Sequence, residues 1–151
     1  MTDRLTDTQL AVQLARKAGE IALALRAEGR LQGRALGDAG DKTANAFLIP
    51  AIREHRPDDA ILSEESEDSD ARLGQSRVWI IDPVDGTRQF VKGSPDHAVM
   101  VAEVRGGQVV RSWIHQPQHA RSYVAERSAG APTVAAQETT SDAPQFSAVL
   151  K

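Results

Sequence analysis

The most informative part of this 151-residue sequence is an apolar run that leads into two aspartates. It reads Val78-Trp79-Ile80-Ile81-Asp82-Pro83-Val84-Asp85-Gly86-Thr87. The β-branched and aromatic first half is typical of a buried strand, which ends abruptly at Asp82-Pro83. Pro83 fixes the turn and Gly86 permits close approach of the backbone, so the carboxylates of Asp82 and Asp85 can converge on one point. The stretch therefore predicts a strand that carries two carboxylates at its end.

Two helices are expected before this strand. Thr6 followed by Gln9 forms a capping-box pattern, and apolar residues then recur at helical spacing, which predicts a helix over residues 6–28. A second apolar helical pattern predicts a helix from about residue 40 to residue 55, with Pro50 inside it. The N-terminal third of the chain is thus expected to be helical.

Short β-rich segments follow these helices. Residues 60–62 form a brief apolar run, residues 97–104 and 108–114 flank the hairpin signal Gly106-Gly107, and residues 122–125 form a last short strand. Two helices followed by mostly antiparallel strands indicate an α+β fold, with the two N-terminal helices packed on a mainly antiparallel sheet.

The last part of the chain differs in composition from the rest. Residues 128–151 are dominated by Ala, Ser, Thr, Pro and Gln and show neither the helical nor the strand period. We therefore expect a single domain over residues 1–127 and a disordered or unrelated tail over residues 128–151.

Composition excludes several classes of function. The net charge of −3 argues against capture of a nucleic acid polymer or of an anionic membrane, because both need a basic surface. The absence of cysteine excludes disulfides, thiolate zinc sites and thiol nucleophiles. The N-terminus lacks a signal-peptide pattern and no apolar run reaches 18 residues, so we expect a cytoplasmic protein.

The aspartates at the end of the strand suggest metal chemistry. Oxygen ligands without His or Cys suit a hard cation, of which magnesium is the commonest near phosphate. Gly86 and Thr87 begin a short helical segment whose backbone N–H groups would face an anion. An ordinary turn remains the alternative for any single Asp-Gly pair.

Three similar motifs are excluded. An EF-hand loop that starts at Asp82 would need Glu at its twelfth position, where Gly93 stands. Phosphatases with an aspartate nucleophile have one residue between their two aspartates, whereas two residues separate Asp82 and Asp85. A P-loop needs Gly-Lys-Ser or Gly-Lys-Thr, and neither is present.

Residues 79–90 closely resemble the signature of the inositol monophosphatase family, whose members are lithium-sensitive, magnesium-dependent phosphomonoesterases. Ser63-Glu64-Glu65 resembles the acidic pair of that family, and residues 36–41, Leu-Gly-Asp-Ala-Gly-Asp, resemble its segment that ends in a metal-binding Asp. The order and spacing of all three segments agree with the family. The resemblance implies the N-terminal domain of the inositol monophosphatase or sugar phosphatase fold.

The same resemblance implies a ligand set. Glu64, Asp82, the carbonyl of Val84 and Asp85 would hold magnesium, and Asp41 would support a metal-bound water and a further ion. Two or three Mg²⁺ ions are implied in the complete site. A metal ion makes hydroxide available near neutral pH because it lowers the pKa of bound water.

Catalytic and phosphate-binding roles follow from the resemblance as well. Glu64 and Thr87 would orient or deprotonate the water, with Asp41 beside them. Asp85, Gly86, Thr87 and Arg88 would contact the phosphate of a small phosphate monoester.

The N-terminal half is most similar to the 3'(2'),5'-bisphosphate nucleotidases of the CysQ type, which convert adenosine 3',5'-bisphosphate to AMP and phosphate. Arg88 fits that group, whereas Gln89 departs from its usual Glu. An inositol-1-monophosphatase or a related sugar or histidinol phosphatase is the alternative, and a homodimer is a possible assembly.

The family's C-terminal α/β domain, with its Trp-Asp motif, has no match in the sequence. A truncated, catalytically inactive metal-binding remnant is therefore a second alternative.

Overall fold

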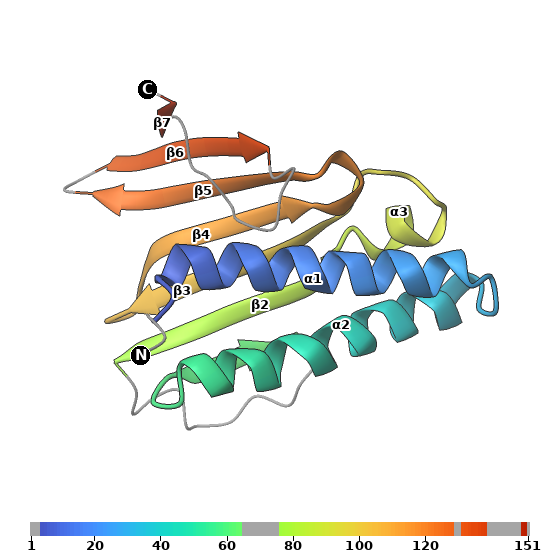
Figure 1. Cartoon of the computed structure of the whole chain (residues 1–151), viewed down its shortest axis with the longest axis horizontal. Coiled ribbons are helices and arrows are strands. Elements are labelled where there is room, and N and C mark those ends of the chain that lie inside the picture. Colours follow the sequence, from blue (N-terminus) through green and yellow to red (C-terminus); the bar gives the residue numbers. More distant parts are fainter. Residues whose placement is uncertain (1–3, 65–75, 129–130, 139–148, 151) are drawn as a thin grey trace.

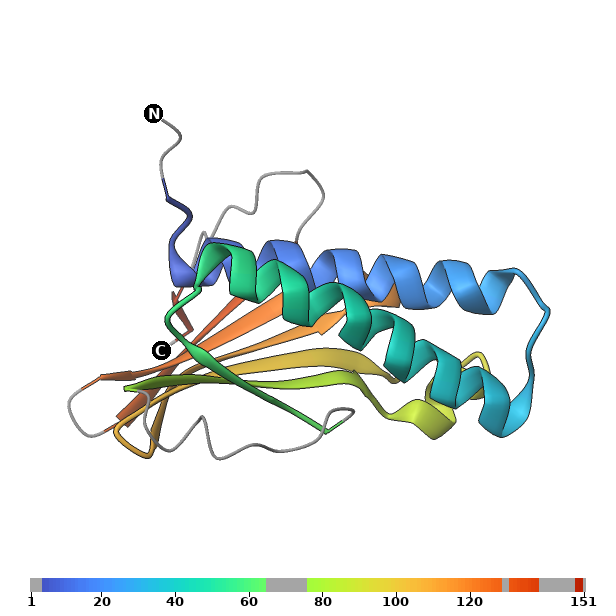
Figure 2. The same cartoon turned by 90° about the horizontal axis from the view of Figure 1, so that it is seen from below.

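The computed structural model describes residues 4–64, 76–128, 131–138 and 149–150. In this part of the chain, two long helices lie side by side on one face of a seven-stranded sheet (Figures 1 and 2). The strands follow one another in chain order across the sheet, and only the first pair is parallel. The predicted α+β fold with a mainly antiparallel sheet is confirmed.

Both predicted helices are present. Helix α1 (Asp7–Ala27) begins with the predicted capping box, in which the Thr6 hydroxyl accepts from the backbone N–H of Gln9 and the Gln9 side chain accepts from that of Thr6. Helix α2 (Gly33–His55) begins well before residue 40, so the predicted start is wrong. The glycines and aspartates of residues 37–41 have low helix propensity, which hid the first turns of α2 in the sequence.

The strands and short helices have the following bounds: β1 (Ala60–Ser63), β2 (Arg77–Asp85), α3 (Thr87–Val91), β3 (Ala98–Arg105), β4 (Gln108–Gln116), the 3-10 turn η2 (Pro117–His119), β5 (Arg121–Ser128), β6 (Ala131–Glu138) and β7 (Val149–Leu150). The predicted hairpin between β3 and β4 is confirmed. Gly106 and Gly107 both have positive φ angles, 56° and 77°, as its tight turn requires.

The expectation that residues 128–151 lack regular structure is wrong for β6. This strand pairs antiparallel with β5 along its whole length, from Ser128 opposite Ala131 to Arg121 opposite Glu138. β7 in turn pairs with β6. Sheet pairing with β5 supplies backbone hydrogen bonds that no side-chain period in the sequence reveals.

The core lies between the helices and the sheet. Trp79 on β2 and Trp113 on β4 are fully buried and stack with their ring centroids 5.8 Å apart. Small residues of the helices, among them Ala15 and Ala44, pack against this layer and let the helices approach the sheet closely. A second cluster, made of Ala22, Leu36, Val84 and Phe90, fixes α3 against both long helices at the other end of the layer.

Within the described residues, no helix is long and apolar enough to cross a membrane.

Candidate functional site

The predicted metal-binding strand end contains a β-bulge. Asp82 pairs with Met100 and Asp85 pairs with Ala98, so β2 spends one residue more than β3 between these two pairs. Residues three apart in a regular strand point to opposite faces, and an extra residue resets that alternation. Pro83 and Val84 are accordingly buried in succession, while Asp82 is half-buried and Asp85 is exposed. The bulge lets both carboxylates serve one region at the end of the strand.

Gly86 then turns the chain from β2 into α3. Its φ angle is +81°, in the left-handed region, and a Cβ atom there would lie 2.8 Å from the backbone oxygen of Asp96. Only glycine fits this position without strain or displacement of the neighbouring loop. Gly86 is therefore a structural requirement for placing α3 directly after the two aspartates.

Two glycines of α2 bring α3 close to Asp41. A Cβ atom on Gly37 would lie 2.8 Å from the methyl carbon of Thr87, and one on Gly40 would lie 2.8 Å from the Phe90 ring. Both positions thus have room for hydrogen only. Asp41 lies on α2 one residue after Gly40, well inside the helix, so it does not cap a helix start.

Thr87 connects these elements. Its hydroxyl lies 3.0 Å from the carbonyl oxygen of Val84 and 3.4 Å from Oδ2 of Asp41. The predicted site residues Asp41, Val84 and Thr87 are therefore brought together, although they lie on α2, β2 and α3.

The carboxyl of Asp82 is the electrostatic centre of the site. Burial raises its pKa, and the negative charges of Glu64, Asp85 and Asp41 raise it further, to about 7. A hydrogen bond with Asp85 also favours the protonated form. Without a counter-charge, neighbouring carboxylates resist ionisation. Three of the four predicted carboxylates thus act on the fourth, that of Asp82.

These residues fit a hard cation by their chemistry, because four carboxylates and the Val84 carbonyl offer oxygen donors only. Among the described residues, however, no group of three or more His, Cys, Asp or Glu side chains is arranged so that it could hold a metal ion. The charge interaction at Asp82 and the lack of such an arrangement are compatible, because charges interact over longer distances than those of metal–ligand bonds. Glu65 lies outside the described residues.

Arg26 is a residue of this region that the sequence analysis missed. It extends from the end of α1, donates to the carbonyl of Phe90 at 3.1 Å and to Oε1 of Gln118 at 3.0 Å, and lies over the Phe90 ring. The carbonyl of Phe90 belongs to the last turn of α3, so Arg26 fastens the short helix that presents Thr87. No periodic pattern in the sequence indicates such a long-range contact.

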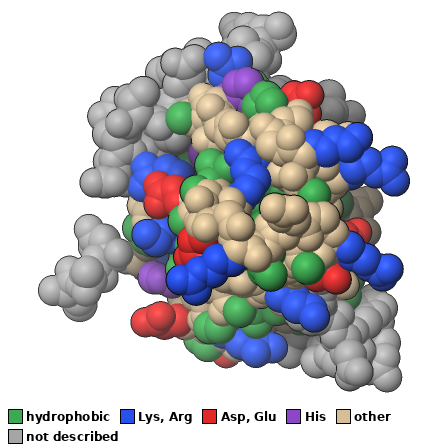
Figure 3. Space-filling model, turned by 90° about the vertical axis from the view of Figure 1, so that its right-hand side faces the viewer, with side chains coloured by type: hydrophobic (Ala, Val, Ile, Leu, Met, Phe, Trp, Pro, Cys, Tyr) green, Lys and Arg blue, Asp and Glu red, His purple; other side chains and the backbone are tan. Residues whose placement is uncertain are grey.

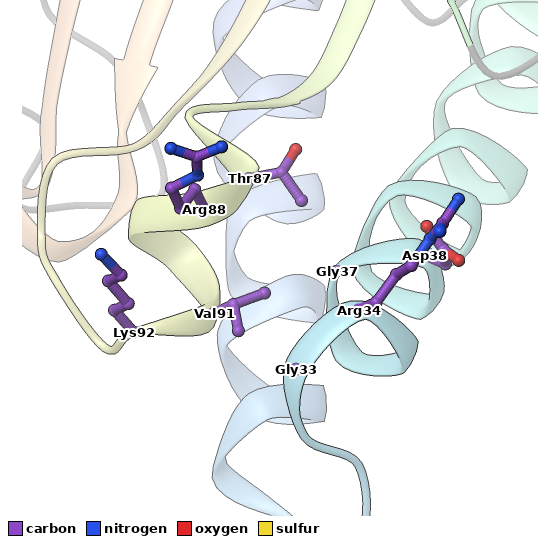
Figure 4. Close-up of a pocket in the computed structure, with 8 residues that line it drawn as sticks. All are labelled: Gly33, Arg34, Gly37, Asp38, Thr87, Arg88, Val91 and Lys92. Carbon is purple, nitrogen blue, oxygen red and sulfur yellow. The ribbon is translucent and has the colours of Figure 1, made fainter.

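A cavity of about 400 Å³ lies between α3 and the first turns of α2 (Figure 4). Its lining residues are Gly33, Arg34, Gly37, Asp38, Thr87, Arg88, Val91 and Lys92. The predicted phosphate-contacting residues Thr87 and Arg88 thus border it. Figure 3 views the molecule from the right-hand side of Figure 1, where α3 lies, and there basic and acidic side chains are interspersed with hydrophobic and uncharged groups.

The protein belongs to the α+β class, and its candidate site is a group of carboxylates at the bulged end of a strand. Its relatives specify that class further. A 3'-phosphoadenosine 5'-phosphate phosphatase of Mycobacterium leprae is 55% identical over 100 residues, which are 65% of this chain and 37% of the relative. A histidinol-phosphatase of Chlorobaculum parvum is 36% identical over 130 residues, 83% of this chain and 49% of the relative. This chain therefore spans between about a third and a half of these relatives' lengths.

Solved structures show the same fold. CysQ from Bacteroides thetaiotaomicron superposes with a TM-score of 0.69 at 26% identity, over 83% of this chain and 47% of that protein. The extragenic suppressor protein SuhB of Bartonella henselae gives a TM-score of 0.69 at 28% identity, over 85% of this chain and 49% of that protein. The sequence profile of the inositol monophosphatase family matches residues 3–149. This chain belongs to the inositol monophosphatase family, whose members are generally metal-dependent.

Proposed function

We propose that this chain forms the magnesium- and phosphate-binding part of a magnesium-dependent phosphomonoesterase. The observation that carries the proposal is the pKa of Asp82, which burial and, after it, three neighbouring carboxylates raise to about 7. Such an accumulation of negative charge is relieved by a divalent cation, and oxygen-only donors favour magnesium. The ligands would be Asp41, Glu64, Asp82, the carbonyl of Val84, and Asp85.

Bound magnesium would supply an activated water and neutralise charge on the phosphate. The chain's own residues would position the reactants. Thr87, held by the Val84 carbonyl and Asp41, presents its hydroxyl at the junction of α2, β2 and α3. Glu64, together with Thr87, would orient the water or accept its proton. Phosphoryl transfer depends mainly on such positioning and on electrostatic stabilisation.

As the substrate we propose a 3'(2'),5'-bisphosphate nucleotide, adenosine 3',5'-bisphosphate above all. The 55% identity to the 3'-phosphoadenosine 5'-phosphate phosphatase of M. leprae supports this choice. The second candidate is another small phosphate monoester, such as histidinol phosphate or inositol 1-phosphate, which the histidinol-phosphatase relative favours at lower identity.

Phosphate release measured with magnesium and with EDTA tests both parts of the proposal. We expect magnesium-dependent release, with a higher kcat/KM for adenosine 3',5'-bisphosphate than for inositol 1-phosphate when the two compete. A preference for inositol 1-phosphate would overturn the substrate assignment and leave the metal site standing. Magnesium binding without any release would instead favour a metal-binding part that is inactive by itself.

A further inference from the structure

Asn45 and Ser63 form a buried polar pair to which the proposed reaction assigns no role. Asn45 lies on α2 and is 9% exposed, and Ser63 is the last residue of β1 and is 3% exposed. The Ser63 hydroxyl donates to Oδ1 of Asn45 over 2.5 Å, at the short end of the range for hydrogen bonds between two oxygens. The pair therefore attaches the end of β1 to α2.

On the side of α2, this pair is close to Asp41. Asp41 and Asn45 are four residues apart in the helix, so they lie on the same face of it, and both are buried. Oδ2 of Asp41 lies 3.4 Å from the hydroxyl oxygen of Thr87. The same face of α2 thus contacts α3 through Asp41 and β1 through Asn45.

On the side of β1, the pair directly precedes Glu64. Ser63 pairs with Ile81 of β2 in parallel register, so the next residues along the two strands, Glu64 and Asp82, are neighbours. The negative charge of Glu64 accordingly acts on Asp82. β1 has four residues and lies at the edge of the described sheet, where β2 is the strand next to it. The bond to Asn45 gives this short edge strand a second attachment, directly before Glu64.

We propose that Asn45 and Ser63 are positioning residues, which hold Glu64 in a fixed place relative to Asp41 and Asp82. The proposal rests on the proposed phosphatase function. Groups that bind a metal ion or orient a water depend on neighbouring hydrogen bonds for their orientation. Glu64 is exposed, so its backbone has to be fixed through the buried residue before it. An amide and a hydroxyl do this without adding a charge beside the four carboxylates.

Calorimetric titration of the 151-residue chain with magnesium tests the positioning role. Asn45→Leu and Ser63→Ala each remove one partner of the hydrogen bond and leave all the proposed ligands in place. We expect each variant to bind magnesium about tenfold more weakly, the lower end of the effect of residues that orient metal ligands. The double variant should bind no more weakly than the weaker of the two single variants, because the two side chains act as one unit.

Thr8→Val is the matched control. The Thr8 hydroxyl accepts from Nε1 of Trp113 at 3.3 Å, so this variant also removes a side-chain hydrogen bond between a long helix and the sheet, but near the start of α1. It should keep the magnesium affinity of the parent. Parental affinity in both Asn45→Leu and Ser63→Ala, or an equal loss in Thr8→Val, would overturn the positioning role. Loss of binding in Asp82→Asn would still uphold the metal site, whereas no magnesium binding by the parent would overturn both.

Amide hydrogen exchange in EDTA separates a local effect from a general loss of stability. Ser63→Ala should speed exchange in β1, which the bond attaches to α2, and leave exchange in β4 as in the parent. Equal acceleration in the two strands would show that the pair only stabilises the fold, and would overturn the positioning role.

Discussion

Acidic side chains gather at both ends of the helical layer, yet the two groups are in opposite electrostatic states. At the end where α1 begins, Asp7, Asp59 and Glu103 are matched by arginines, and we call this group the arginine network. At the end where α3 lies, the carboxylates of Asp41, Glu64 and Asp85 act instead on the carboxyl of Asp82. The same residue types thus stabilise the fold in one place and leave a charge to be compensated in the other.

The pKa values express this difference. Burial by itself would raise the pKa of Asp7, but the hydrogen bond from Arg56 and the charges of Arg77, Arg56 and Arg111 lower it below its usual value. The pKa of Asp82 is instead raised to about 7 by burial and by three carboxylates. A carboxylate whose pKa is lowered stabilises the fold at neutral pH, whereas one whose pKa is raised destabilises the fold until a cation binds.

The largest effect is expected from breaking the arginine network. Arg56 is buried and donates to Oδ1 of Asp7 at 2.9 Å and to the carbonyl of Leu5 at 2.7 Å. Arg56→Met should lower the free energy of unfolding by about 3–5 kcal/mol, because it leaves a partly buried carboxylate with less compensation. Urea denaturation measures the loss. Arg53→Met, at an exposed position of α2, should stay within about 0.5 kcal/mol of the parent, and equal losses in the two variants would contradict the comparison.

A paired glycine experiment tests whether the approach of α3 to its neighbours is sterically fixed. Gly86 and Gly93 have similar positive φ angles, +81° and +79°, but a Cβ atom meets backbone only at Gly86. Alanine should cost about 1–2 kcal/mol at both positions through φ. At Gly86 it should cost about 1–3 kcal/mol more through crowding. Thermal melts compare the variants, and an equal loss at both positions would show that the loop at Asp96 yields freely.

Magnesium should stabilise the end of the helical layer where Asp82 lies. Because the cation binds the folded form, millimolar magnesium should raise the free energy of unfolding by about 1–3 kcal/mol over EDTA. Asp82→Asn should abolish this difference, while Asp58→Asn, at an exposed turn, should keep it. Thermal melts of the three proteins decide the matter, and a shift that persists in Asp82→Asn would place the bound cation elsewhere.

The smallest effect concerns pH, because two groups act in opposite directions. Asp82 has a folded-state pKa of about 7, above its usual value of 3.8, so without metal its contribution to stability is present below pH 4 and is lost as pH rises through 7. Burial, with a smaller effect of Arg16, lowers the pKa of His115 from 6.5 to about 4, so its contribution is present above pH 6.5 and is lost as pH falls through 4.

The two contributions offset each other between about pH 4 and 6.5. In EDTA, the parent should therefore show little change of stability over this range, whereas Asp82→Asn should become more stable as pH rises. Urea denaturation at several pH values compares the two proteins. Parallel pH profiles would show that Asp82 does not titrate in this window.

Much of the fold could be predicted because local patterns determine it. The capping box at Thr6 and the Gly106-Gly107 turn depend on neighbouring residues and are confirmed. The start of α2 was missed because Gly37 and Gly40 weaken the helical pattern for a reason that lies in α3, namely the packing of Thr87 and Phe90. β6 was missed because its pairing with β5 carries no side-chain signal.

The candidate site likewise has residues that the sequence could predict and features that it could not. Asp82, Val84 and Asp85 lie in one continuous motif, so the sequence could indicate them as a group. The bulge that redirects Asp82 relative to Asp85 could not be predicted, since it depends on the register with Met100 and Ala98. Arg26 and the cavity between α2 and α3 could not be predicted either, because they arise where segments far apart in the sequence meet.

The central claim is that the carboxylates around Asp82 await a cation, and proton release on magnesium binding tests it most directly. Metal binding expels the proton of a ligand that is protonated beforehand. Calorimetric titration with magnesium in two buffers of different ionisation enthalpy counts the released protons. With the pKa of Asp82 at about 7, the account predicts release of about one proton at roughly pH 6, almost none at roughly pH 8.5, and none in Asp82→Asn at either pH. Magnesium binding that releases no proton at the lower pH, or that is unchanged in Asp82→Asn, would contradict it.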